Sequence, residues 1–198
     1  MPPSPWIKAL LDTIHHHCPG LSDAALQRVG GGLQVLELPA RQVFIHQGDT
    51  PTQVAYVARG LLKAVYTDSQ GEQVNVNFFR EHTGAGDYYA MRNGEPARYD
   101  FVAVEASTLV LMPFTHFNDC CRDMPELERF YRIMLEQALF AYVRRTERFL
   151  ITKAEQRYQD FMQDDPELFS RLSVSDLCSY LGIRRQTLTA IRKKLAGN

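Results

Sequence analysis

Between residues 33 and 113 the apolar side chains follow the spacing of β-strands, and this pattern limits most strongly what the chain can fold into. Short runs rich in Val, Leu and Phe are separated by turn signals such as Gly60 and residues 68–71, DSQG. Within residues 73–78 every second residue is apolar, which predicts a half-buried strand with a polar face formed by Gln73, Asn75 and Asn77. Several short strands at this spacing favour a sandwich or a jelly-roll barrel.

The spacing becomes helical after Pro113. Residues 126–150 contain no Gly or Pro, and apolar side chains surround almost the whole predicted helix. One domain surface rarely needs an apolar face of that width. We therefore expect the helix to pack on its own β-domain and on the same helix of a second subunit, with a core helix in a monomer as the alternative. The predicted dimer interface consists of Phe130, Met134, Ala138, Ala141 and Tyr142.

Residues 173–195, SVSDLCSYLGIRRQTLTAIRKKL, have the spacing of a helix-turn-helix. Leu177 would face inward from the first helix, and Leu188 would anchor the second. Gly182 would allow the positive φ that a tight turn between the helices needs. Ser175 is the expected N-cap of the first helix. An ordinary helical hairpin with a basic surface is the alternative.

Charge is distributed unevenly along a chain whose net charge is only −1. From Gly182 to the last residue there are five basic and no acidic side chains, which indicates an anion-binding module on a neutral body. Arg and Gln can pair with guanine and adenine in the major groove, and Thr and Lys can hold phosphates. The predicted DNA-binding residues are Arg184, Arg185, Gln186, Thr187, Thr189, Arg192 and Lys193.

The order of these elements resembles the Crp/Fnr superfamily of bacterial transcription regulators. The resemblance covers residues 30–195 and rests on the helix-turn-helix together with FIHQGD (44–49), VARG (57–60), LKAVYTD (62–68) and AVEASTLVLMP (103–113). It implies an α+β fold with an N-terminal β-roll, a double-stranded β-helix like that of cyclic nucleotide-binding domains, then a long dimerisation helix and a C-terminal helix-turn-helix domain. The corresponding domain boundaries are 1–123, 124–150 and 151–198.

The same resemblance implies a homodimer whose two recognition helices, about 34 Å apart, bind a palindromic DNA site. It also implies that the β-roll senses a small signal. Family members with three base-contacting residues have an arginine where this chain has Ala190, which leaves Arg185 and Gln186 as the expected base readers.

Members that bind cyclic nucleotides hold the ribose with a glutamate and the cyclic phosphate with an arginine. Matching Gly86-Asp87 and Ala103 to that pattern puts Ala97 at the arginine position and Arg98 one residue later. Adjacent strand residues point to opposite faces, so Arg98 would point away from a phosphate, and we expect weak or no cyclic AMP binding. A bulge that restores the register, and with it a cyclic-nucleotide-binding regulator, is the alternative. The candidate effector-pocket residues are Gly86, Asp87, Tyr88, Tyr89, Ala97, Arg98 and Tyr99.

An enzyme is the rival class of protein. A β-barrel with His46, His82 and His116 would suit a metal-dependent cupin, but the tight HxH pair of such a site is missing. Residues 15–18, HHHC, could recruit a metal or haem, although consecutive helical side chains point in different directions. Residues 120–121 are adjacent cysteines and candidate redox-sensing thiols. We expect no enzymatic activity, no metal and no cofactor.

Composition places the chain among ordinary soluble proteins, with 198 residues of which 45% are hydrophobic and 23% charged. The N-terminal segment lacks the pattern of a secretory signal, and no uninterrupted apolar run is long enough to span a membrane. We expect a cytoplasmic protein with reduced cysteines and no membrane partner. Its expected partners are double-stranded DNA and a second copy of the chain, with RNA polymerase and an unidentified small-molecule effector as further candidates.

Overall fold

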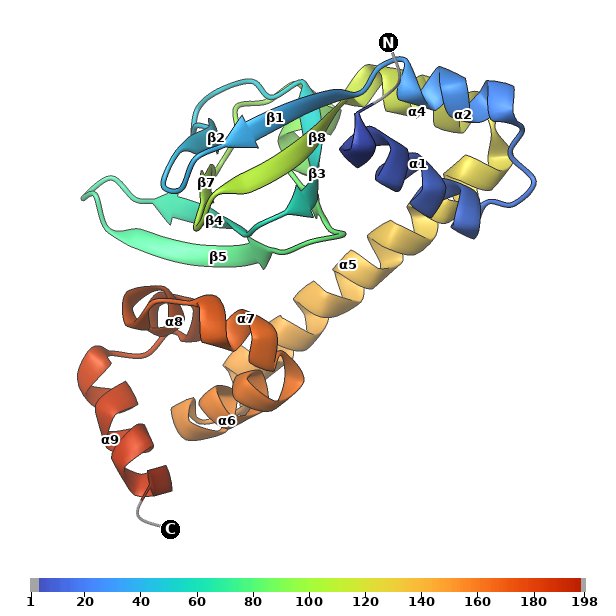
Figure 1. The fold of residues 1–198 in the computed structure, drawn as a ribbon. Coiled ribbons are helices and arrows are strands. Elements are labelled where there is room, and N and C mark those ends of the chain that lie inside the picture. The colour runs from blue at the N-terminus through green and yellow to red at the C-terminus, as the bar shows by residue number, and fades with distance from the viewer. Residues whose placement is uncertain (1–3, 197–198) are drawn as a thin grey trace.

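Two four-stranded antiparallel sheets form a β-roll in the computed structural model, which describes residues 4–196 (Figure 1). The strand orders are β1-β8-β3-β6 and β2-β7-β4-β5. The mixed α+β class and the β-roll predicted from the sequence are confirmed. The strands are β1 (Gln34–Leu38), β2 (Val43–Ile45), β3 (Gln53–Arg59), β4 (Leu62–Thr67), β5 (Gln73–Phe79), β6 (Gly84–Ala85), β7 (Asp100–Ala103) and β8 (Ser107–Pro113).

A closed apolar core fills the space between the two sheets. Successive strand side chains point to opposite faces, so alternate residues of β3, β4 and β7 reach the interior. Phe101 lies at the centre and packs against Phe79, with ring centroids 5.6 Å apart. The buried members of this core are Leu38, Ile45, Ala55, Val57, Leu62, Ala64, Phe79, Ala85, Ala97, Phe101, Ala103, Leu109 and Leu111.

The predicted hairpin at residues 68–71 connects β4 and β5, and Gly71 adopts a positive φ there. The alternation predicted for β5 is wrong. Asn75, assigned to the polar face, is buried, while Val74 is half-exposed. The reason is tertiary: α8 (Val174–Leu181) packs on the polar face of β5 and covers Asn75.

Three helices pack on one end of the β-roll and form a second apolar core. They are α1 (Pro5–His17), α2 (Asp23–Gly30) and α4 (Phe114–Asp123). The first two correspond to the short helices expected before residue 30. A further short helix, α3 (Tyr88–Asn93), lies in the loop between β6 and β7 and has no apolar spacing in the sequence that predicts it.

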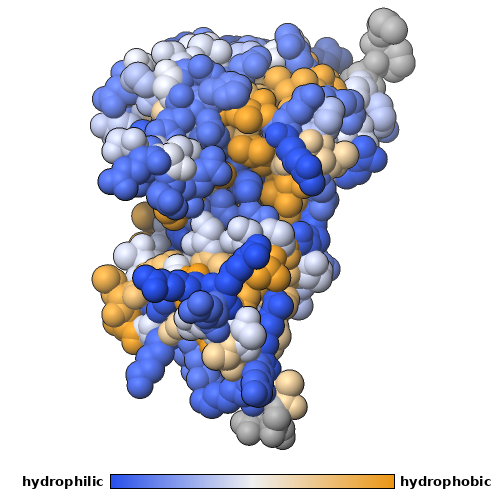
Figure 2. Space-filling view, turned by 90° about the vertical axis from the view of Figure 1, so that its left-hand side faces the viewer, coloured by the Kyte–Doolittle hydropathy of each residue, from blue (hydrophilic) through white to orange (hydrophobic). Residues whose placement is uncertain are grey.

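The long helix α5 (Pro125–Ile151) runs from this end of the β-roll toward the C-terminal helices (Figure 1). The C-terminal helices are α6 (Ala154–Asp164), α7 (Pro166–Arg171), α8 and α9 (Arg185–Ala196), and they share a third apolar core. On the face shown in Figure 2 the β-roll with its N-terminal helices and the C-terminal helices are both mainly hydrophilic, with a few apolar patches. Within residues 4–196 no helix is long and apolar enough to cross a membrane.

Candidate DNA-binding surface and effector pocket

The helix-turn-helix consists of α8 and α9. Gly182 ends α8 in the left-handed conformation, with φ +63° and ψ +42°, as predicted for the turn. A Cβ at this position would also approach the Phe149 ring of α5 to 2.8 Å, so the turn needs glycine for two reasons. The N-cap is Ser173, whose hydroxyl accepts a hydrogen bond from the Asp176 amide at 3.0 Å. The prediction of Ser175 as the cap was therefore wrong by two residues.

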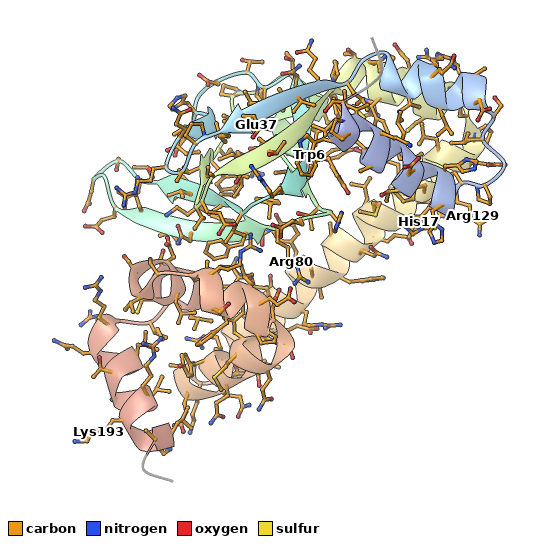
Figure 3. All side chains as sticks on the ribbon, in the orientation of Figure 1. Trp6, His17, Glu37, Arg80, Arg129 and Lys193 are labelled. Atoms are coloured by element: carbon orange, nitrogen blue, oxygen red, sulfur yellow. The ribbon has the colours of Figure 1, made fainter. Side chains whose placement is uncertain are left out.

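The second helix is fixed by Leu188 and Ile191, both buried in the third core. The residues at the start and on the outer face of α9 point to solvent. The exposed predicted DNA-binding residues are Arg184, Arg185, Gln186, Thr187, Thr189, Arg192 and Lys193. Lys193 projects outward from α9, away from the rest of the protein (Figure 3).

Two cations of α9 already have partners in the protein. The Arg192 Nε donates to the Tyr158 hydroxyl at 3.3 Å, and its guanidinium lies over the Tyr158 ring. Lys194 binds the Glu155 carboxylate at 2.8 Å. Within residues 4–196 no ion pair neutralises Arg185 or Lys193, so their charges are available to an anion.

In the candidate effector pocket, Asp87 is buried and both of its carboxylate oxygens are occupied. Oδ1 accepts the amide of Ala90 at 3.1 Å and so caps α3, and Oδ2 accepts the amide of Arg98 at 3.0 Å. Gly86 precedes it, where a Cβ would come within 3.2 Å of the Met91 methyl group. The carboxylate that would hold a ribose thus serves to fix the loop between β6 and β7.

Ala97 and Arg98 lie on opposite sides of the wall of the β-roll. Ala97 belongs to the buried core, whereas the Arg98 side chain is 55% exposed. The Arg98 guanidinium lies over two tyrosine rings, 4.9 Å from the centroid of Tyr89 and 5.4 Å from that of Tyr99. It is also 3.9 Å from Asp87. No cation from this segment reaches the interior of the roll.

The remaining aromatic residues of the pocket set are divided between two environments. Tyr88 leans toward α4 and α5, with its ring 5.7 Å from Phe114 and 6.4 Å from Tyr131. Burial raises the pKa of Tyr131, so this phenol stays neutral. Tyr99 packs against the core between the sheets. The predicted pocket residues are close in sequence, but the structure does not gather their side chains around one cavity.

The residues of the predicted dimer interface lie in different environments on α5. Phe130 packs in the second core, and its ring stacks on His17 at 5.2 Å. Met134 is half-buried, whereas Ala138 and Ala141 are exposed. The N-terminal helices thus partly bury Phe130 at this end of α5, and the interface predicted from the sequence stays a prediction.

Another side of α5 carries an apolar stripe that we call the α5 stripe. It consists of Leu135, Leu139, Val143 and Leu150, all exposed. Spacings of four, four and seven residues keep these side chains along one side of a helix. Tyr142, from the predicted set, is exposed beside the stripe, and its hydroxyl accepts a hydrogen bond from the Asn77 amide group at 3.3 Å.

A polar interface holds the helix-turn-helix against the β-roll. The Asp176 carboxylate on α8 accepts hydrogen bonds from Lys63 Nζ at 2.6 Å and from Asn75 Nδ2 at 3.0 Å, both on the β-roll. The backbone amide of Asn75 donates a second hydrogen bond, to the Ser179 hydroxyl at 2.8 Å. Burial on its own would raise the pKa of Asp176, but hydrogen bonds from Lys63, Ser173 and Asn75 outweigh it and lower the pKa.

A second contact joins α7 to the loops of the β-roll. Arg171 forms two hydrogen bonds with Glu81, at 2.9 and 3.0 Å, and two with Glu105, at 2.7 and 3.4 Å. These hydrogen bonds lower the pKa of Glu81 to about 2. Sequence analysis did not find this interface, because pairs 66 to 113 residues apart leave no local pattern.

The histidines and cysteines considered for metal binding are dispersed. His46 lies 3.9 Å from Asp100, His82 bonds to the Tyr56 hydroxyl, and His116 bonds to the Arg28 carbonyl. In the part of the chain that the structure describes, no three His, Cys, Asp or Glu residues form a cluster that could hold a metal. The four cysteines are all buried, and burial raises the pKa of the Cys121 thiol to about 12.

This arrangement is similar to that of known proteins. Residues 35–124 match the model of the cyclic nucleotide-binding domain family. No curated protein matches the chain by sequence. Among solved structures, CLP of Xanthomonas campestris, a c-di-GMP responsive global regulator, is 14% identical with a TM-score of 0.72, over 89% of this chain and 92% of that one.

FixK2 of Bradyrhizobium japonicum is also 14% identical with a TM-score of 0.72, over 83% of this chain and 85% of its own. A regulator of the Crp/Fnr family from Eubacterium rectale is 10% identical with a TM-score of 0.70, over 90% and 85% of the two chains. Residues 35–124 are therefore similar to the cyclic nucleotide-binding domain family, and the chain has the overall fold of the Crp/Fnr transcription regulators.

Proposed function

We propose that this chain is a DNA-binding transcription regulator that acts as a homodimer. The exposed outer face of α9 carries the proposal. Arg185, Gln186 and Lys193 project from a helix whose other side is anchored in the core, which is the arrangement that a recognition helix needs in the major groove. The similarity of the whole fold to transcription regulators supports the same function.

Selection of bound sequences from random DNA tests this proposal. We expect a two-fold palindrome. Arg185→Ala should lower the preference for the selected site over random DNA by about 10- to 100-fold, because a base contact is lost. Lys193→Ala should weaken binding to both DNAs alike and reduce the salt slope by about 1, because a phosphate contact is lost.

Lys8→Ala is the matched control for charge, since Lys8 is exposed on α1, far from α9 along the chain. It should leave the affinity and the salt slope unchanged. Equal losses on selected and random DNA for both Arg185→Ala and Lys193→Ala would contradict the assigned roles.

The α5 stripe is the proposed dimer interface. Exposed leucines spaced along one side of a long helix favour pairing with a second copy of that helix. Leu139→Glu puts a charge at the middle of the stripe and should convert a dimer into a monomer, as measured by light scattering. Val74→Glu, at an exposed apolar residue of β5, is the matched control and should remain dimeric. A wild-type monomer at micromolar concentration would refute the interface.

We further propose that the effector is not a cyclic mononucleotide. The argument is geometric: Ala97 occupies the inward position, Arg98 lies outside, and both oxygens of Asp87 are engaged by backbone amides. Isothermal titration with cyclic AMP and cyclic GMP should detect no binding in the micromolar range. Micromolar binding of either nucleotide would overturn this proposal and leave the DNA-binding proposal untouched.

A further inference from the structure

A cleft of about 580 Å³ lies where β5, α5, α6 and α8 meet. This volume is within the range of small-molecule binding sites. Arg80, labelled in Figure 3, lies near the place where the β-roll approaches α5. Five arginines line the cleft, from the residue after β5, from α5 and from α6: Arg80, Arg144, Arg145, Arg148 and Arg157.

The positive charge of the cleft is only partly neutralised. Arg80 pairs with Asp165 at 3.0 Å, and Arg148 pairs with Asp164. For the other three arginines, no carboxylate within residues 4–196 forms an ion pair. Guanidinium groups that share a cleft repel one another unless an anion lies between them, so the arrangement favours a negatively charged occupant.

Arg145 forms the inner wall of this cleft. Its guanidinium lies 4.4 Å from the ring centroid of Tyr180 and 5.1 Å from that of Phe149. Nη2 donates to the carbonyls of Asn75 and Tyr180, but Nε is buried without a partner. Burial lowers the pKa of Arg145, which is the expected effect on a cation held without a counter-charge.

An aromatic surface is available beside the charge. Phe140 lines the cleft and is 62% exposed, and Arg144 lies one helical turn later on α5. At about 100° per residue, Arg144 and Arg148 lie roughly half a turn from the α5 stripe. A second subunit packed on the stripe would leave this side of the helix open.

We propose that the cleft binds a nucleotide whose phosphates contact the arginines and whose base stacks on Phe140. Guanidinium groups bind phosphate through paired hydrogen bonds, and Arg144, which is exposed and has no ion pair within residues 4–196, supplies such donors. The exposed Phe140 ring offers a flat apolar surface on which the base can stack. This site is distinct from the candidate pocket in the β-roll, and its existence does not depend on DNA binding.

The cleft also borders the junction of the β-roll, α5 and the C-terminal helices. Its wall includes Arg157, which donates to the carbonyls of Thr152 and Leu181 and so links α6 to the ends of α5 and α8. A nucleotide bound here would contact the β-roll, α5 and the helix-turn-helix at once.

Isothermal titration of the intact chain tests the site with four probes, without divalent cations: ATP, GTP, tripolyphosphate and adenosine. ATP or GTP should bind at least tenfold more tightly than tripolyphosphate, and adenosine should not bind. Arg144→Gln should weaken nucleotide binding about tenfold, since an exposed guanidinium without an ion pair is removed from the surface. Phe140→Leu keeps the site apolar and should weaken ATP or GTP but not tripolyphosphate.

Arg129→Gln is the matched control, because Arg129 is exposed on α5 near the N-terminal helices and away from the cleft (Figure 3). It should bind nucleotide like the wild type. The proposal is overturned if neither ATP nor GTP binds at about 1 mM, if tripolyphosphate binds as tightly as both nucleotides, or if Arg129→Gln and Arg144→Gln lose affinity equally.

Discussion

Removal of Arg171 tests how strongly the helix-turn-helix is held on the β-roll. Its guanidinium binds Glu81 with two hydrogen bonds and Glu105 with two more. The fall in the pKa of Glu81 from 4.5 to about 2 corresponds to roughly 3 kcal/mol at face value. Both carboxylates are partly exposed and screened by solvent, so we expect Arg171→Gln to lower the free energy of unfolding at pH 7 by about 1–2 kcal/mol.

The pH dependence gives this prediction a sign. The pKa of Glu81 is lower in the folded protein, so its stabilising contribution is complete above pH 4.5 and is lost as the pH falls from 4.5 toward 2. Urea denaturation followed by circular dichroism should therefore show a difference between wild type and variant that is largest at neutral pH and shrinks below pH 4.5.

Arg122→Gln is the control for this experiment, because Arg122 forms a more exposed pair with Asp119 on the surface of α4. It should change stability by less than about 0.5 kcal/mol. A change equally small for Arg171→Gln, or a difference between wild type and Arg171→Gln that is the same at pH 3 and pH 7, would refute the reasoning.

Three further predictions concern the folded core. Gly182→Ala should cost more stability than Gly94→Ala in thermal denaturation, by about 1 kcal/mol or more, because both glycines are left-handed helix caps but only Gly182 would place a Cβ against Phe149. Leu188→Ala should destabilise the helix-turn-helix by about 2–4 kcal/mol in urea denaturation, since Leu188 is fully buried. Cys121 should resist thiol reagents at pH 8 in the folded protein and react after unfolding, as followed by mass spectrometry, because its pKa is about 12; rapid labelling of the native protein would contradict this.

Local patterns in the sequence predicted most of the fold. The long helix was expected at 126–150 and is found at Pro125–Ile151, and the glycine turn of the helix-turn-helix adopts the predicted positive φ. Counting from Asp87 and Ala103 placed Ala97 inward and Arg98 outward; Ala97 is buried and Arg98 is exposed, although both precede β7 and lie outside any strand. The long helix and the glycine turn depend on residues close in sequence, where the helical period applies directly.

The errors arose where distant segments meet. Asn75 looked like a solvent-facing strand residue. Its backbone amide, however, donates to the Ser179 hydroxyl and its side-chain amide donates to the Asp176 carboxylate, both on α8. Phe130 fitted a dimer interface by spacing, and the N-terminal helices of its own chain partly bury it. In both cases the local amphipathic pattern did not indicate which distant segment packs on the face.

The arginines explain why composition alone says little about this chain. A net charge of −1 hides three different uses of the same side chain. Arg98 lies over tyrosines outside the β-roll. Arg171 on α7 is neutralised by two carboxylates of the β-roll, and these ion pairs join the C-terminal helices to the β-roll. Arg144 and Arg185 have no ion pair within the described part of the chain, and one lies in the α5 cleft while the other lies on the recognition helix. Since uncompensated cations attract an anion most strongly, we expect anionic ligands to bind at the α5 cleft and at α9.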